Sequence, residues 1–183
     1  MRRDTPLAYG FVSRVFHWTM ACLIGWQFTI AVGWRVFGDG AVMKTVSLLG
    51  PSHRTAGALL FALVVPRAIW AFRNRRQRPV DRGLPGASAR IVHAMIYLLI
   101  FSVPGLALAR TYANGRGFDL WGLRLVPETG HRIEWLTGLA DLLHAPLAWG
   151  LAVLVAGHVL MAVVHTAVLR DGLLRRMIGT PQG

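Results

Sequence analysis

The chain has 183 residues, of which 54% are hydrophobic and 15% charged, and its formal net charge is +12. So apolar a composition, gathered in long blocks, excludes an ordinary soluble domain. The single cysteine, Cys22, excludes an intrachain disulfide and covalent cofactor attachment through paired cysteines, and we expect it to be a small apolar residue on a membrane helix. The basic residues lie beside apolar blocks, so we expect no nucleic-acid partner.

Four apolar segments reach the length of about 20 residues that a helix needs to cross a bilayer core. Residues 1–14 are short and polar, so we expect the first segment to be an uncleaved signal anchor. The sequence therefore predicts one all-α domain over residues 1–183, an integral membrane four-helix bundle with both termini on one side. The predicted spans are residues 15–37, 53–72, 90–111 and 144–169.

The loops between these spans differ in character. Residues 38–52 form the first loop, and residues 73–89 form an arginine-rich turn that we expect to set the topology and to touch anionic lipid. The third loop, 112–143, is glycine-rich and ends in an amphipathic piece near 133–143. We expect that piece to lie flat on the membrane surface.

The charges of the loops orient the chain. The face with the termini and residues 73–89 carries 13 basic residues against three acidic ones, and the other face carries seven against five. By the positive-inside rule, the N- and C-termini are expected to be cytoplasmic, in a bacterial inner membrane. Six tryptophans lie near predicted span ends or in the third loop, as is typical of interfacial aromatic residues: Trp18, Trp34, Trp70, Trp121, Trp135 and Trp149.

Histidines are the least expected residues in these spans, because an imidazole is costly among lipid-facing side chains. His144 and His158 are fourteen residues apart, which brings them within about 40° of each other on a helix, about 21 Å apart along its axis. His165 continues nearly the same stripe. His17 begins the first span at the inner side, and His53 begins the second at the outer side.

The depths then match in two pairs, His53 with His144 outside and His17 with His158 inside. Two imidazoles from facing helices can hold a porphyrin iron in a bundle core, so the pattern predicts two non-covalent haems, one above the other. Gly57 and Gly157 adjoin the ligands and would permit close approach of a flat ring, although glycine also serves helix packing.

Two arginines also lie near the ligand turns. Arg14 and Arg54 could pair with haem propionates or merely extend to the membrane surface. Other uses of the four histidines fit less well. A zinc site needs its ligands at one depth, and a proton relay usually includes an intramembrane carboxylate, which the apolar middles of the spans lack. Isolated histidines bonded to backbone would explain one residue better than four.

At this point the chain resembles the bacterial cytochrome b561 family, whose members are four-helix membrane cytochromes. The resemblance covers nearly the whole chain and rests on motifs found in order along it. These motifs are Arg14-x-x-His17-Trp18, His53-x3-Gly57-x9-Arg67-x2-Trp70, His93-x3-Tyr97 with Pro104-Gly105, His144-x13-His158-x6-His165, and Asp171-x2-Leu174-Arg175-Arg176-Met177.

The resemblance implies two b-type haems held by the same four histidines, and electron exchange with ubiquinone in the inner membrane. Some members are similar to superoxide oxidases, which pass an electron from superoxide to ubiquinone. The third loop is longer here than in other members, which leaves the outer donor open. As a hypothesis, His165 belongs to a quinone site. His93 is expected to be an interfacial polar residue and His131 an ordinary loop residue.

The sequence therefore predicts a membrane oxidoreductase that moves single electrons between an outer-face donor and quinone. If the donor is superoxide, a cationic outer surface would steer it, formed by Lys44, Arg54, Arg110, Arg116, Arg124 and Arg132. The alternative is a haem-carrying anchor subunit that relays electrons from a dehydrogenase, hydrogenase or periplasmic cytochrome docked on the third loop. A histidine-lined transporter is a weaker third reading.

Overall fold

The computed structural model describes residues 3–78 and 83–179, and most of them are helical. The long helices are α1 (Phe11–Phe37), α3 (His53–Arg73), α4 (Gly83–Ala113) and α5 (Glu134–Val164). Each contains an apolar stretch long enough to cross a bilayer, and the last stretch continues to Leu169 through a π-helical turn, η1 (His165–Leu169). The predicted fold class, an all-α membrane bundle, is confirmed, and the chain is a multi-pass membrane protein.

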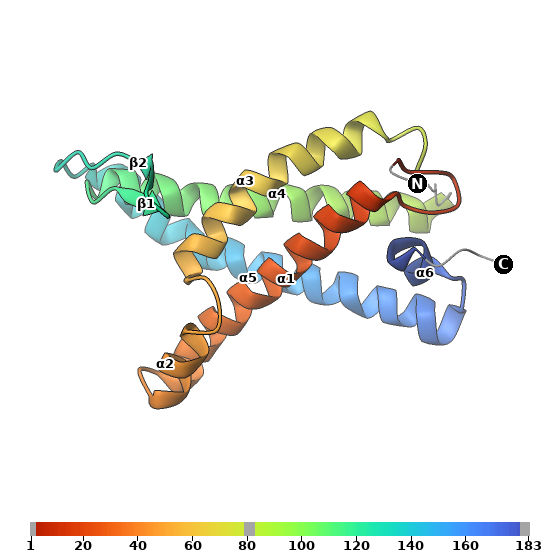
Figure 1. Ribbon diagram of the computed structural model, residues 1–183, viewed down its shortest axis with the longest axis horizontal. Coiled ribbons are helices and arrows are strands. Elements are labelled where there is room, and N and C mark those ends of the chain that lie inside the picture. Colours follow the sequence, from red (N-terminus) through yellow and green to blue (C-terminus); the bar gives the residue numbers. More distant parts are fainter. Residues whose placement is uncertain (1–2, 79–82, 180–183) are drawn as a thin grey trace.

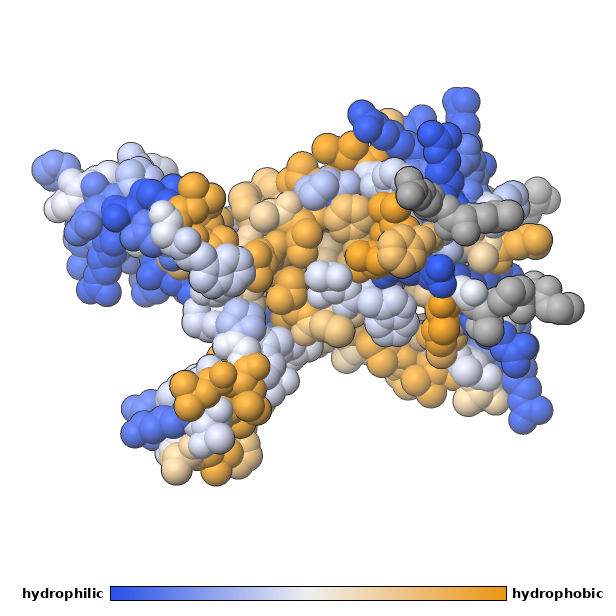
Figure 2. All heavy atoms as spheres, in the orientation of Figure 1, coloured by the Kyte–Doolittle hydropathy of each residue, from blue (hydrophilic) through white to orange (hydrophobic). Residues whose placement is uncertain are grey.

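The two ends of the bundle differ in composition. Both termini lie at one end, and the strands and the short helix α2 (Ala41–Ser47) lie at the other (Figure 1). Apolar side chains cover the middle of the molecule, and hydrophilic side chains gather toward both ends (Figure 2). This banding is what a bilayer requires of the surface that faces it. Arg2 and Arg82, counted above for the inner face, lie outside the described residues.

The start of α5 corrects one prediction. Residues 134–143 do not lie flat as a separate amphipathic piece, because they form the first turns of a continuous helix that begins at Glu134. Thr137 and Ala140 are buried, and Asp141 forms an ion pair with Arg110 of α4. Contacts with α4 therefore stabilise the helical conformation of this segment, which lies outside the apolar span.

The remaining parts of the third loop form a hairpin of strands β1 (Phe118–Leu120) and β2 (Leu123–Val126), which pair antiparallel. Trp121 and Gly122 connect them with φ of 49° and 87°. Two consecutive positive φ angles match the twist of a tight hairpin. The buried Phe118 and Val126 cluster with Ala58 of α3, so the hairpin covers the ends of the helices that lie away from the termini. This end of the bundle is called the outer end below, and the end with both termini the inner end.

The main core lies at mid-height in the bundle. Buried residues from all four long helices meet there, and they are Met20, Ile24, Leu60, Val64, Ile100 and Leu151. On α5, Leu151 is midway in sequence between His144 and His158, and Met20 follows His17 by about one turn. An apolar layer therefore separates an outer level of the bundle from an inner one.

Candidate functional site

Two histidines meet at the outer level. His53 is the first residue of α3, and the Oγ of the preceding Ser52 accepts a hydrogen bond from the Thr55 amide (3.2 Å), which caps the helix there. The ring centre of His53 lies 6.4 Å from that of His144 on α5, and the two ring planes meet at 73°. Nδ1 of His144 lies 3.1 Å from the carbonyl oxygen of Val103, and donation to that oxygen leaves Nε2 available as a ligand.

Three histidines meet at the inner level. The ring centre of His17 on α1 lies 6.2 Å from that of His158 on α5, at an interplanar angle of 68°. The ring centre of His93 on α4 lies 5.1 Å from the ring centre of His158. The structure therefore brings together both predicted pairs and adds His93, which the sequence predicted to be an interfacial polar residue near the inner haem. Its ring belongs to the inner cluster.

The geometry of the pairs suits a metal held between two imidazoles. With about 2 Å from the metal to each nitrogen, as in zinc–histidine sites, the two ring centres would lie roughly 6 Å apart. Among the described residues, no group of three or more histidine, cysteine, aspartate or glutamate side chains is placed to hold a metal ion. Each pair supplies only two ligands, so a group that brings its own equatorial nitrogens fits this donor set.

A cavity of about 360 Å³ adjoins the outer pair and is lined by α1, α3, α4 and α5, including His53, His144, Gln27 and Gly57. The Oε1 atom of Gln27 is buried without a hydrogen-bond partner. A Cβ on Gly57 would come within 3.1 Å of Nε2 of Gln27, so this glycine leaves room at the wall. Gly157 faces open space, with nothing within 4 Å of a Cβ placed there.

The two predicted propionate partners differ in their surroundings. Arg54 lines the outer cavity, donates from Nη2 to the carbonyl oxygen of Gly117 (2.6 Å) and lies over the ring of Phe118. Arg14 instead donates from Nη1 to the carbonyl oxygen of Ile178 (2.5 Å), which ties α1 to the helix α6 (Leu173–Ile178). Only Arg54 therefore lies in the wall of the histidine site.

Arg67 is a site residue that the sequence showed only as part of the motif in the second span and as one of the basic residues near the inner face. Its Nη2 lies 3.2 Å from Nδ1 of His17, and its Nη1 lies 3.6 Å from Sδ of Met20. Its guanidinium also lies over the ring of Tyr97, 5.2 Å from the ring centre. The signal that could have revealed it is an arginine inside an apolar helix, on the same helix as His53 and four turns further along.

His165 lies at the end of α5, in the π-helical turn. Its Nδ1 is 2.5 Å from Oδ2 of Asp171, and Oδ1 of Asp171 accepts a hydrogen bond from the Leu173 amide (3.0 Å). The hydrogen bond from His165 lowers the pKa of the Asp171 carboxyl below its usual value. His131 lies exposed in the segment between β2 and α5 and is not in the wall of the outer cavity.

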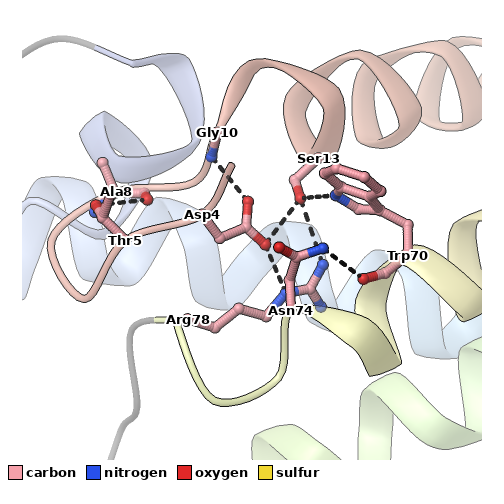
Figure 3. Close-up of polar contacts among 8 residues, drawn as sticks. All are labelled: Asp4, Thr5, Ala8, Gly10, Ser13, Trp70, Asn74 and Arg78. Carbon is pink, nitrogen blue, oxygen red and sulfur yellow. Dashed lines mark hydrogen bonds and ion pairs between the residues drawn. The ribbon is translucent and has the colours of Figure 1, made fainter. Parts of the chain in front are cut away.

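A separate polar network closes the inner end of the bundle (Figure 3). The buried carboxylate of Asp4 accepts hydrogen bonds from the Gly10 amide (2.8 Å), Oγ of Ser13 (2.9 Å) and Nε of Arg78 (2.8 Å). Nε1 of Trp70 donates to the same Ser13 oxygen (2.9 Å). This network joins the N-terminal segment, α1 and the residues that follow α3.

A model of the prokaryotic cytochrome b561 family matches residues 8–180. The chain belongs to this family. Membership implies a membrane cytochrome that binds b-type haem and takes part in electron transfer. The chain is 30% identical over 181 residues to cytochrome b561 homolog 2 of Escherichia coli K12, covering 96% of this chain and 94% of that protein. It is 27% identical over 182 residues to the protein named probable superoxide oxidase CybB of Yersinia pestis, covering 96% and 98%.

Proposed function

We propose that this cytochrome binds two b haems and transfers single electrons between a donor at its outer face and ubiquinone. The observation that carries the proposal is the pair of facing imidazoles at each of two levels, with ring centres 6.4 and 6.2 Å apart. His53 and His144 would hold the outer haem, and His17 and His158 the inner one. Arg54 and Gly57, in the wall of the outer cavity, would contact the outer haem.

The rest of the chain supports such a relay. When bound, each haem supplies a one-electron couple whose potential depends on its ligands and on burial. The four imidazoles would hold these couples at successive depths, and buried apolar residues such as Met20, Leu60 and Leu151 lie between the two levels. We propose that the whole chain works as one domain, in a bacterial inner membrane with cytoplasmic termini, in accord with its charge distribution.

Superoxide is the donor we favour, because a relative is named a probable superoxide oxidase. In the balanced reaction two superoxide anions each lose one electron and become O₂, while ubiquinone takes both electrons and two protons. The outer cavity has three arginines in its wall, Arg54, Arg110 and Arg116, and these would attract an anion.

Ubiquinone would bind at the inner end of α5, near His165. The imidazole is half-buried, on a helix that also carries His158, and it is oriented by Asp171. An imidazole has one nitrogen that can donate a proton and one that can accept it, so His165 would pass on the protons that the reduced quinone needs. Arg14 would then act on the inner end through α6 rather than by direct contact with a histidine pair.

The test is to purify the protein in detergent and measure haem per chain and the reduced-minus-oxidised spectrum. Superoxide and a soluble ubiquinone analogue are then added together, and quinone reduction is followed. Two b haems per chain and superoxide-dependent quinone reduction are expected. Purified protein that binds no haem, even when haem is supplied, would refute the proposal, and a variant with His144→Ala should retain one haem.

A second function is favoured by the exposed tip of the hairpin. Trp121 is 79% exposed, Leu123 64% and the nearby Trp135 71%. Such side chains could receive a redox protein, in which case the chain would serve as the haem-carrying anchor subunit of a dehydrogenase, hydrogenase or periplasmic cytochrome. Two haems without superoxide activity would favour this function, and so would a neighbouring gene for a redox enzyme.

A further inference from the structure

Arg67 is a charged residue inside a membrane span to which the proposed function assigns no task. It is six residues before the end of α3, and His17 is six residues after the start of α1, so both lie about 9 Å inside the inner ends of their helices. Nη2 of Arg67 lies 3.2 Å from Nδ1 of His17. A guanidinium is expensive to keep within a span, which makes it a candidate for function.

Among the described residues, no carboxylate side chain forms an ion pair with Arg67. Its contacts are the imidazole of His17, the thioether of Met20 and the ring of Tyr97, none of which carries a negative charge. Arg78, by contrast, pairs with the buried Asp4. The inner histidines therefore lie beside a cationic side chain, in partly buried surroundings that screen its charge less than water does.

The outer pair has different partners. His144 directs Nδ1 at a backbone carbonyl, and an imidazole that donates to such an acceptor is a more basic ligand, which favours the oxidised metal. Of the arginines near this pair, Arg54 is exposed and donates to the carbonyl oxygen of Gly117, and Arg110 is paired with Asp141. Water and ions screen charges there more than they screen a charge in the span.

We propose that Arg67 is a positioning residue that raises the reduction potential of the inner site. The proposal rests on the haem ligation proposed above. Reduction of an iron removes one positive charge from it, so a fixed cation nearby favours the reduced state. With an effective dielectric constant of about 20, a unit charge within about 10 Å changes that equilibrium by tenfold or more. Electrons would thereby be favoured to arrive at the end of the protein where we place the quinone.

The experiment is a redox titration of the haem absorbance on the purified haem-loaded protein and three variants. The titration should show two reduction steps, one for each haem. Arg67→Gln should lower the reduction potential of one step by at least about 59 mV, which is a tenfold change in the equilibrium constant of a one-electron couple, and should leave the potential of the other step unchanged. Arg67→Lys keeps the charge and should stay within about threefold of the wild type. Arg75→Gln is the matched control, because Arg75 is exposed and stacks on Phe72 (3.8 Å), beyond the end of the same helix.

Two results would overturn the inference. One is an Arg67→Gln protein that keeps both haems and has the same two reduction potentials as the wild type. The other is an equal shift in the Gln and Lys variants, which would show that the charge is not the cause. If Arg67→Gln loses one haem, the Arg67→Lys variant decides. Unchanged reduction potentials in that variant support the role of the charge, and a fall of one potential that corresponds to a tenfold change in the equilibrium constant refutes it. Failure of the proposed function is distinct, because the wild type would then bind no haem at all.

Discussion

Removal of the Asp4 carboxylate is expected to destabilise the protein far more than removal of an exposed carboxylate. The side chain of Asp4 is fully buried, that of its partner Arg78 is 24% exposed, and the carboxylate also accepts hydrogen bonds from Gly10 and Ser13. Breaking a buried ion pair by removing one partner costs about 3–5 kcal/mol. Because Arg78 can partly rehydrate, we expect Asp4→Ala to lower the free energy of unfolding by about 2–4 kcal/mol.

The matched control is Asp119→Ala, which removes the carboxylate paired with Arg124 in the hairpin. Both side chains of that pair are about half exposed, so its loss should cost about 0–1 kcal/mol. The assay is reversible unfolding in mixed micelles with increasing denaturing detergent, followed by tryptophan fluorescence. Trp70 donates to Ser13 inside the network and should report its opening (Figure 3).

A double-mutant cycle with Arg78→Ala isolates the interaction between the two charges. The reasoning would be refuted if Asp4→Ala cost no more than Asp119→Ala, or if the cycle gave no coupling. Asp4→Asn should lie between the wild type and the alanine variant, because it retains an oxygen that can accept from the Gly10 amide but loses the charge.

Three further results are expected. The rate of superoxide oxidation should fall with ionic strength in stopped-flow measurements, because salt screens the arginines of the outer cavity; a salt-independent rate would contradict steering. His165→Ala should keep two haems yet slow the reduction of a ubiquinone analogue, and unchanged quinone kinetics would exclude the assigned role. The hydrogen bond from His165 lowers the pKa of the Asp171 carboxyl below its ordinary value of 3.8, so this bond stabilises the junction of α5 and α6 at pH values above 3.8. That contribution is lost as the pH falls through the lower pKa of the folded protein. Limited proteolysis after Arg170 should therefore increase at acid pH in the wild type and show a weaker pH dependence in Asp171→Asn.

Hydropathy was enough to predict the four helices, because a bilayer imposes one length and one polarity on each span. The pairs His53–His144 and His17–His158 followed from two facts, the alternating direction of the passes and the fourteen-residue spacing on α5. The structure brings these residues together, while their assignment as haem ligands stays a prediction. The relative depths of the four histidines could thus be predicted from helical periodicity and from the direction of each pass.

The regions outside the bilayer were harder to predict, because there tertiary contacts decide local structure. The hairpin depends on Phe118 and Val126 packing against Ala58, more than fifty residues away in the chain. The early start of α5 depends on its contacts with α4, which the sequence of 134–143 does not reveal. Arg67 stood in the motif of the second span, but its proximity to His17 depends on the relative rotation of α1 and α3, which sequence periodicity leaves undetermined.

Each histidine pair contains one member from α5, so a single helix fixes the distance between the two proposed haem levels. Fourteen residues separate His144 from His158, about 21 Å along the axis, and tilting of the other helices cannot alter this rise. The exception is Pro146, two residues beyond His144, where the missing amide hydrogen weakens the helix and permits a bend. Bending there would displace His144 against a stationary His158. The length of the proposed electron path would thus be set by this one helix, and bending at Pro146, close to the proposed outer ligand, would change it.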